Sequence, residues 1–165
     1  MKSPYAGLRF VAVAAAFLMV AACSSTDATS SATPSSSSST VTPGTQQDLV
    51  TNVGDRVFFD TDKSNLKDDG KATLQRQAAW MKLYPNLTFS IEGHADERGT
   101  REYNLALGGR RAAAVKDFLV SLGIDGSRLN TVSYGKERPV CLESNEDCWS
   151  QNRRAVTVVA DGASS

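Results

Sequence analysis

The chain has 165 residues, with 18 lysines and arginines balanced by 18 aspartates and glutamates, so its formal net charge is zero. This length suits one modest domain and excludes a large multidomain assembly. The neutral balance argues against a broad basic surface, so no nucleic-acid partner is expected. Hydrophobic residues make up 41% of the chain, which is sufficient for a core.

The first 22 residues have the features of a cleaved export signal. Lys2 and Arg9 precede an uncharged apolar run over residues 10–22. Such a run is too short to cross a bilayer as a stable helix, but it is typical of the apolar part of a secretory signal. We therefore expect residues 1–22 to be removed.

Cys23 follows this run directly and is the only cysteine among the first 140 residues. With Val20, Ala21 and Ala22 before it, the site resembles the lipobox of bacterial lipoproteins. The resemblance implies thioether lipidation of Cys23 and acylation of the new N-terminus, with palmitate, and several acyl chains hold a protein on a membrane. Ser24, which is not aspartate, implies by the same resemblance the periplasmic face of the outer membrane. The alternative is a plain secretory signal with an incidental cysteine.

The segment over residues 23–45 is predicted to be a flexible tether. Of the 22 residues from 24 to 45, 15 are serine or threonine. Because almost nothing in it is apolar, burial cannot offset the entropy lost on ordering the segment. We expect it to let an anchored domain over residues 46–160 search the layer below the membrane. Residues 161–165 are left as a short tail.

The first half of the folded part is predicted to contain a strand, a helix and a second strand. Residues 56–59 are aromatic and β-branched, which is typical of a strand. A helix is expected to begin with a cap at Asp68 or Asp69 and to end before Pro85. Residues 87–91 alternate between apolar and polar, the period of a half-buried strand.

The second half is predicted to contain a long helix and two more strands. The helix spans about residues 103–122 and is ended by Gly123. Residues 131–134 and 155–160 are expected to be strands, with a short helix over residues 144–152 between them. Strands that alternate with helices predict an α/β sandwich in which helices cover one sheet.

Cys141 and Cys148 form an even pair in a polar stretch of an exported protein. The oxidising compartment favours a disulfide between them. A metal site would need further ligands, and the single histidine, His94, lies far away in the sequence. The stretch from Asp60 starts like a calcium loop, but Asn65 replaces the required glycine. No metal and no cofactor are therefore expected.

One charged residue falls on the apolar face of the long helix. At helical spacing, Arg111 shares a stripe with Leu107 and Val115. A guanidinium near a core is costly unless an anion meets it. Gly108 is expected to leave open space beside it, and Asp96 is a candidate partner. Either Arg111 and Asp96 form a buried salt bridge, or they flank a pocket for a zwitterion whose ammonium binds the aspartate and whose carboxylate binds the arginine.

A set of motifs in this part resembles the signature of the OmpA-like peptidoglycan-binding domain family. The motifs read Gly93-His94-Ala95-Asp96-Glu97-Arg98-Gly99-Thr100, Glu102-Tyr103-Asn104, Leu107-Gly108, Arg110-Arg111-Ala112 and Ala114-Val115. Two later stretches, Ser133-Tyr134-Gly135-Lys136-Glu137 and Asn152-Arg153-Arg154-Ala155-Val156, are most similar to the peptidoglycan-associated lipoproteins of that family. The resemblance covers nearly all of residues 56–160. It implies an α/β (α+β) two-layer sandwich with a mixed four-stranded sheet covered by helices.

The resemblance also implies a binding site. In this family the aspartate after the second strand and the arginine of the following helix hold the meso-diaminopimelate of the peptidoglycan stem peptide, and these positions fall on Asp96 and Arg111. By the same analogy, the site is lined by Asn104, Leu107, Asp60, Thr61 and Asp62.

The resemblance implies a lipid-anchored protein that is not an enzyme. Its function would be to tether the outer membrane to the wall. The resemblance also implies membership of the Tol–Pal system of the envelope and cell division, with a TolB-like periplasmic partner. Two alternatives stay open: a lipid-anchored wall-processing enzyme, and a scaffold that only holds other envelope proteins.

Overall fold

A computed structural model describes residues 41–161. The expected signal over residues 1–22, the lipidation site Cys23, most of the tether and residues 162–165 lie outside the described residues. In chain order the elements are α1 (Gln46–Asp48), a π-helical turn (Leu49–Val53), β1 (Arg56–Phe58), α2 (Asp68–Leu83), β2 (Thr88–His94), α3 (Arg101–Ser121), a 3-10 turn (Gly126–Arg128), β3 (Leu129–Gly135), α4 (Glu146–Asn152) and β4 (Arg154–Asp161).

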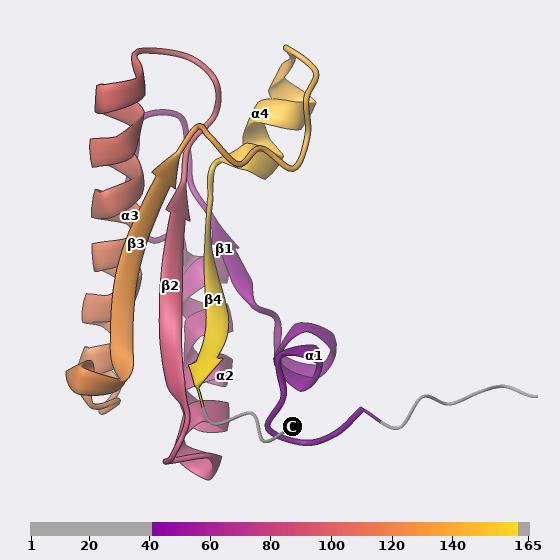
Figure 1. Cartoon of the computed structure of the whole chain (residues 1–165), viewed down its shortest axis with the longest axis vertical. Helices are drawn as coiled ribbons and strands as arrows, with labels where there is room; N and C mark the ends of the chain where they lie inside the picture. Colours follow the sequence, from indigo (N-terminus) through magenta and orange to yellow (C-terminus); the bar gives the residue numbers. More distant parts are fainter. Residues whose placement is uncertain (1–40, 162–165) are drawn as a thin grey trace, which may run out of the picture. The chain divides into compact units, whose positions relative to one another are not determined.

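The four strands form one mixed sheet in the order β1-β4-β2-β3. β2 runs parallel to β3, and β4 runs antiparallel to both β1 and β2. A parallel pair needs a crossover, and α3 supplies it between β2 and β3. In Figure 1, α2 and α3 lie against one face of the sheet, whereas α4 stands beyond the edge of the sheet at which β4 begins. The expected mixed four-stranded α/β sandwich is confirmed.

The core lies between the sheet and these two helices. Alternate residues of β2, Phe89 and Ile91, are fully buried because every second side chain faces the helices. The helices meet them with residues at helical spacing, which on α2 include Leu74, Ala78 and Met81 and on α3 include Ala112, Val115 and Leu119. The apolar periods in the sequence therefore locate both layers of the core.

The start of α2 differs from its prediction. Lys67 is the capping residue and makes no side-chain hydrogen bond to the helix, whereas Asp68 and Asp69 lie in the first turn. The Asp69 carboxylate accepts from the amide of Gly70 at 2.9 Å. The predicted cap at Asp68 or Asp69 was therefore wrong, and both carboxylates instead lie in the first turn, near the positive end of the helix dipole.

The helical turn that precedes β1 was not predicted from the sequence. It is anchored by Asp48, whose carboxylate accepts from the indole of Trp80 at 2.9 Å and from the amide of Gly44 at 2.9 Å. The Thr45 hydroxyl also caps this turn by accepting from the Asp48 amide. Glycine and threonine of the serine-rich stretch thus already take part in the fold.

Two further observations bear on the predictions. Cys141 and Cys148 are joined by a disulfide with their Cα atoms 5.0 Å apart, so the expected bridge is confirmed. Gly108 does not leave open space, because it packs directly against Gly93 of β2.

Over residues 41–161, none of the helices is long and apolar enough to span a membrane.

Candidate functional site

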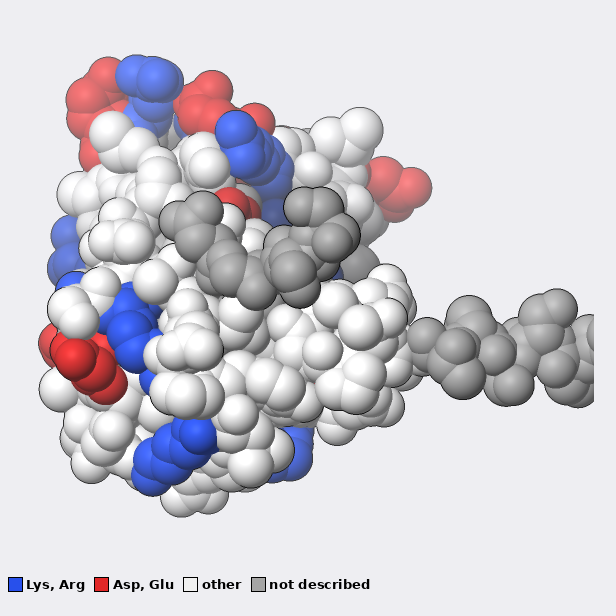
Figure 2. All heavy atoms as spheres, turned by 60° about the horizontal axis from the view of Figure 1, so that its bottom comes forward, with Lys and Arg blue, Asp and Glu red and all other residues white. Residues whose placement is uncertain are grey.

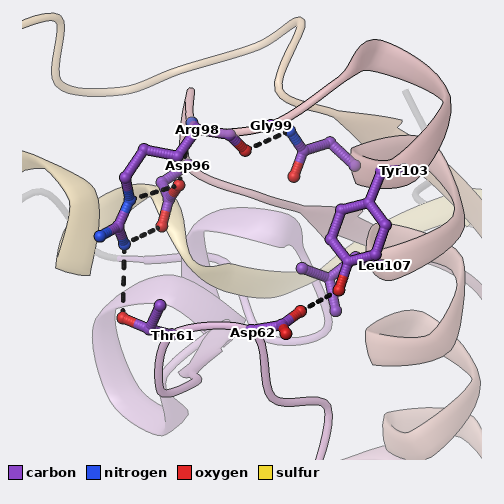
Figure 3. Close-up of a pocket in the computed structure, with 8 residues that line it drawn as sticks. Thr61, Asp62, Asp96, Arg98, Gly99, Tyr103 and Leu107 are labelled. Atoms are coloured by element: carbon purple, nitrogen blue, oxygen red, sulfur yellow. Dashed lines mark hydrogen bonds and ion pairs between the residues drawn. The ribbon is translucent and has the colours of Figure 1, made fainter.

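A cavity of about 190 Å³ opens where β2 ends and α3 begins. It is lined by Thr61, Asp62, Asp96, Arg98, Gly99, Tyr103, Asn104 and Leu107. Figure 3 shows Arg98 and Asp96 on one side, Tyr103 and Leu107 on the other, and Thr61 and Asp62 along the lower edge. Two parts of the chain that are far apart in sequence therefore build this site: the loop after β1, and the continuous stretch formed by the loop after β2 and the first turns of α3.

The loop after β1 is fixed by contacts across the cavity. Asp62 adopts a left-handed backbone with φ of 57°, which aspartate tolerates better than most residues. Its carboxylate accepts a hydrogen bond from the Tyr103 hydroxyl on α3 (Figure 3). This bond to the Asp62 side chain holds the loop and α3 on opposite sides of the opening.

The loop after β2 is held by hydrogen bonds from α3 and from the residue that follows β3. The Asn104 amide donates to the carbonyl of Arg98 at 2.8 Å. The Lys136 ammonium donates to the carbonyls of Glu97 and Gly99 at 3.1 and 2.7 Å. The backbone of this loop is thus fixed, and its residues Asp96, Arg98 and Gly99 line the cavity.

Asp96 is a buried carboxylate, 7% exposed, at the edge of this cavity. The Arg98 guanidinium donates to both of its oxygens, at 3.1 and 2.7 Å, and Arg153 donates to one of them at 3.5 Å. Burial alone would raise the pKa of Asp96, but the hydrogen bonds from Arg98 and Arg153 outweigh it and hold the pKa below its usual value. Asp96 is therefore an anion at neutral pH.

Arg111 lies beneath the cavity with a fully buried side chain. Its three nitrogens donate to the backbone carbonyls of Lys63, His94 and Asp60 at 2.8, 2.7 and 3.1 Å. Burial, opposed by the charge of Asp96, lowers the pKa of Arg111 to about 10, so it remains a cation. In the part of the chain that the structure describes, no ion pair joins Arg111 to Asp96, so a direct salt bridge between them is not formed.

The helix α4 supports the same site from outside. The indole N–H of Trp149 on α4 donates to the Glu97 carboxylate at 2.9 Å, and the Arg98 guanidinium lies 4.2 Å from the centre of the Trp149 ring. Arg153, directly after α4, donates to the carbonyl of Phe59 and to the carboxylate of Glu146 as well as to Asp96. The disulfide and α4 thus position the cations that surround Asp96.

Five of the seven residues expected at the site line the cavity: Asp96, Asn104, Leu107, Thr61 and Asp62. Arg111 lies beneath it, and the side chain of Asp60 points elsewhere, toward Lys67 at 3.8 Å. The cavity is also lined by Arg98, Gly99 and Tyr103, which were not predicted from the sequence. All three fall within the motifs described above. Their closeness in sequence to Asp96 and Asn104 could therefore have predicted that they line the site.

Figure 2 turns the end of the molecule opposite to this cavity toward the viewer. Its surface is made mainly of uncharged residues, with a few charged side chains among them and others at the edge. The convergence of charge around Asp96 is therefore a local feature and not a property of the whole surface.

The chain belongs to the OmpA family, whose model matches residues 58–154. This range contains every residue of the cavity. Among solved structures, the fold is similar to the crystal structure of the peptidoglycan-associated lipoprotein from Burkholderia pseudomallei, with a TM-score of 0.63 and 45% identity over 64% of this chain and 90% of that chain. The fold is also shared with the C-terminal domain of Helicobacter pylori MotB, with a TM-score of 0.61 at 20% identity over 66% of this chain and 86% of that one.

Curated relatives are more similar in sequence. The peptidoglycan-associated lipoprotein of Rhizobium meliloti is 63% identical over 123 residues, which are 74% of this chain and 70% of the relative. That of Agrobacterium fabrum is 62% identical over 120 residues, or 73% of this chain and 68% of the relative. The expected resemblance to the peptidoglycan-associated lipoproteins of this family is confirmed.

Proposed function

We propose that this protein binds peptidoglycan without covalent chemistry and tethers the outer membrane to the wall. In the proposal it is anchored by lipid at Cys23 on the periplasmic face of that membrane. The family match and the names of the similar lipoproteins support peptidoglycan as the ligand. In the proposal, the group that binds is the diaminopimelate of the stem peptide, and the charges in and around the cavity support this choice.

The observation that carries the proposal is a buried cation, Arg111, that lies close enough to feel the charge of the buried Asp96 carboxylate but forms no ion pair with it among the residues described. Asp96 can attract an ammonium, whereas Arg111 has only neutral partners among the residues described: three backbone carbonyls and the Phe59 ring, whose centre lies 5.1 Å from the guanidinium carbon. A buried cation without a carboxylate partner is costly. An incoming ligand carboxylate would reduce that cost, so the site favours a zwitterion.

Diaminopimelate satisfies this requirement better than lysine does. Its side-chain end carries both an ammonium and a carboxylate, whereas lysine ends in an ammonium alone. In the proposal Asp96 accepts from the ammonium, and Arg111 provides the positive charge that the carboxylate meets. Each guanidinium has five N–H groups, and Arg111 uses three of them in the bonds described. Two donors therefore remain.

The other proposed contacts have supporting roles. Leu107 and Asn104 form the side of the cavity on α3, and Thr61 and Asp62 form the side on the loop after β1. Asp60 contributes through its carbonyl, which fixes Arg111, and not through its carboxylate. The proposed site thus binds by complementary charge and shape and needs no nucleophile.

The same proposal includes membership of the Tol–Pal system, with a TolB-like periplasmic partner. It rests on the similarity to the peptidoglycan-associated lipoproteins. Cross-linking in intact cells tests it: the TolB-like protein should be recovered with this chain, and wall fragments should reduce the yield if the two ligands share a surface.

Calorimetric titration of the purified protein with a diaminopimelate-containing muropeptide, and with its lysine counterpart, tests the binding site. We expect saturable binding that is selective for the diaminopimelate form and is lost in Asp96→Asn and in Arg111→Lys. Asp117→Asn, on an exposed part of α3, is the matched control for removal of one carboxylate. Circular dichroism verifies the fold of each variant. No binding by the folded wild type at millimolar muropeptide would refute the proposal and favour an anchored scaffold.

A further inference from the structure

The carboxylate of Asp96 has no free acceptor position in this conformation. One oxygen accepts from the amide and from Nε of Arg98, both at 3.1 Å. The other accepts from the terminal nitrogen of Arg98 at 2.7 Å and from Arg153 at 3.5 Å. A carboxylate offers about four lone-pair sites, and all are occupied. An ammonium can therefore bind Asp96 only if one of these donors leaves.

Arg98 is the donor that can leave. Its side chain is 39% exposed, whereas that of Arg153 is 7% exposed. Arg153 is also held by the Phe59 carbonyl at 3.1 Å and by Glu146. Among residues 41–161, the Arg98 side chain has one further hydrogen bond besides those to Asp96, a weak one to the Thr61 hydroxyl at 3.3 Å.

In the position in which it bonds to Asp96, the Arg98 guanidinium already has a second favourable contact. Its central carbon is already 4.2 Å from the centre of the Trp149 ring, within the range of a cation–π contact. The hydrogen bond to Asp96 raises the pKa of Arg98, and the negative charges of Asp96, Glu146 and Glu97 act in the same direction. A small rotation would thus release Asp96 and leave the cation on the indole near these carboxylates.

We propose that Arg98 occupies the ammonium position of the empty site and must be displaced before a wall peptide binds. This inference rests on the function proposed above, because it assigns Asp96 to the ligand ammonium. Arg98 keeps a buried carboxylate paired in the empty state. It also weakens binding, because the apparent dissociation constant equals the intrinsic one divided by the fraction of molecules in which Asp96 is free. The affinity of the site is therefore set by the exchange of one cation for another.

Removal of the competing cation tests this assignment. If Asp96 is free in about one molecule in ten, Arg98→Ala should bind the diaminopimelate muropeptide about tenfold more tightly than the wild type. Arg98→Lys keeps a competing cation and should gain less. Arg101→Ala is the matched control, because Arg101 pairs with Glu137 outside the cavity and its loss removes the same charge nearby.

Nuclear magnetic resonance of the arginine Nε–H groups provides a measurement that needs no variant. Titration of the wild type with the muropeptide should shift the Arg98 Nε–H signal, and the Nε–H signal of the buried Arg111 should remain observable as an internal reference for the fold. Unchanged or weaker binding by folded Arg98→Ala, with normal binding by the wild type, would overturn the inference while the proposed function stands. If the wild type itself does not bind, the proposed function fails instead.

Discussion

Gly93 of β2 and Gly108 of α3 lie against each other where the helix crosses the sheet. A Cβ atom at Gly93 would overlap the Gly108 carbonyl, and one at Gly108 would overlap the Ser133 hydroxyl and come within 2.8 Å of the Gly93 oxygen. The two glycines therefore determine how closely α3 approaches β2. Because Arg111 lies one turn further along α3, the same contact also determines its depth beneath the cavity.

Gly108→Ala should destabilise the protein even though alanine favours helices. The new methyl group has to displace backbone of β2 or the Ser133 side chain, and overpacking of this kind costs about 1–3 kcal/mol. Gly109→Ala is the matched control, because a Cβ atom there meets nothing within 4 Å and should stabilise α3 by roughly 0.5–1 kcal/mol. Urea unfolding of the two variants measures both effects, and equal stability of the two would contradict the close-contact explanation.

The single histidine should make the stability depend on pH. His94 is 2% exposed, and neither ring nitrogen has a hydrogen-bond partner in the part of the chain described. Burial, with the positive charges of Arg154, Arg138 and Arg56, lowers the pKa of His94 from 6.5 to about 4. Glu92, with an oxygen 3.8 Å from Nε2, is the carboxylate beside it.

Between these two pKa values the unfolded chain binds a proton that the folded chain does not. Stability should therefore fall as pH decreases from 6.5 to about 4, by about 3 kcal/mol in total. Urea unfolding across this range measures the slope, and His94→Gln should flatten it. Proton resonances of the imidazole give a direct check, since titration near 6.5 in the folded protein would show that the explanation is wrong.

A buried hydrogen bond between α2 and β4 should contribute to stability. The Thr157 hydroxyl donates to the Gln77 side-chain carbonyl at 2.8 Å, and the Gln77 amide donates to Gly54 at 2.7 Å. Thr157→Val leaves the Gln77 oxygen buried without a donor, which costs about 1–3 kcal/mol. Thr157→Ser keeps the hydroxyl and should lose less. Chemical unfolding of both variants would show no such ranking if the bond were unimportant.

Reduction of the disulfide should destabilise the protein and loosen α4. The bridge closes a short loop, with a sequence separation of 7, for which the entropy model gives roughly 2 kcal/mol. Trp149 on α4 reports the local change through its fluorescence. The double variant Cys141→Ala/Cys148→Ala should match the reduced wild type and should not respond to reductant. A response of that variant to reductant would assign the effect to another part of the chain.

The sequence determined the layers of this fold because side-chain period reports which face of an element is buried. Phe89 and Ile91 alternate with polar residues, so the strand and its buried side followed directly. The same reasoning identified Arg111 on a buried face of α3. The motif around Asp96 then predicted the family and most of the cavity lining. These features depend on residues that are close in sequence, or on a pattern that repeats.

Only the tertiary structure decided what each buried charge contacts. Arg111 bonds to carbonyls of Asp60, Lys63 and His94, which lie 51, 48 and 17 residues away. The spacing of apolar residues shows on which face of a helix or strand a side chain lies, but it does not show which atoms of other segments that side chain contacts. Likewise, Arg98 follows Asp96 closely in sequence, yet its position depends on an indole at Trp149, delivered by a helix beyond β3. Charge partners are chosen by packing between distant segments, and that information becomes available only when the chain is folded.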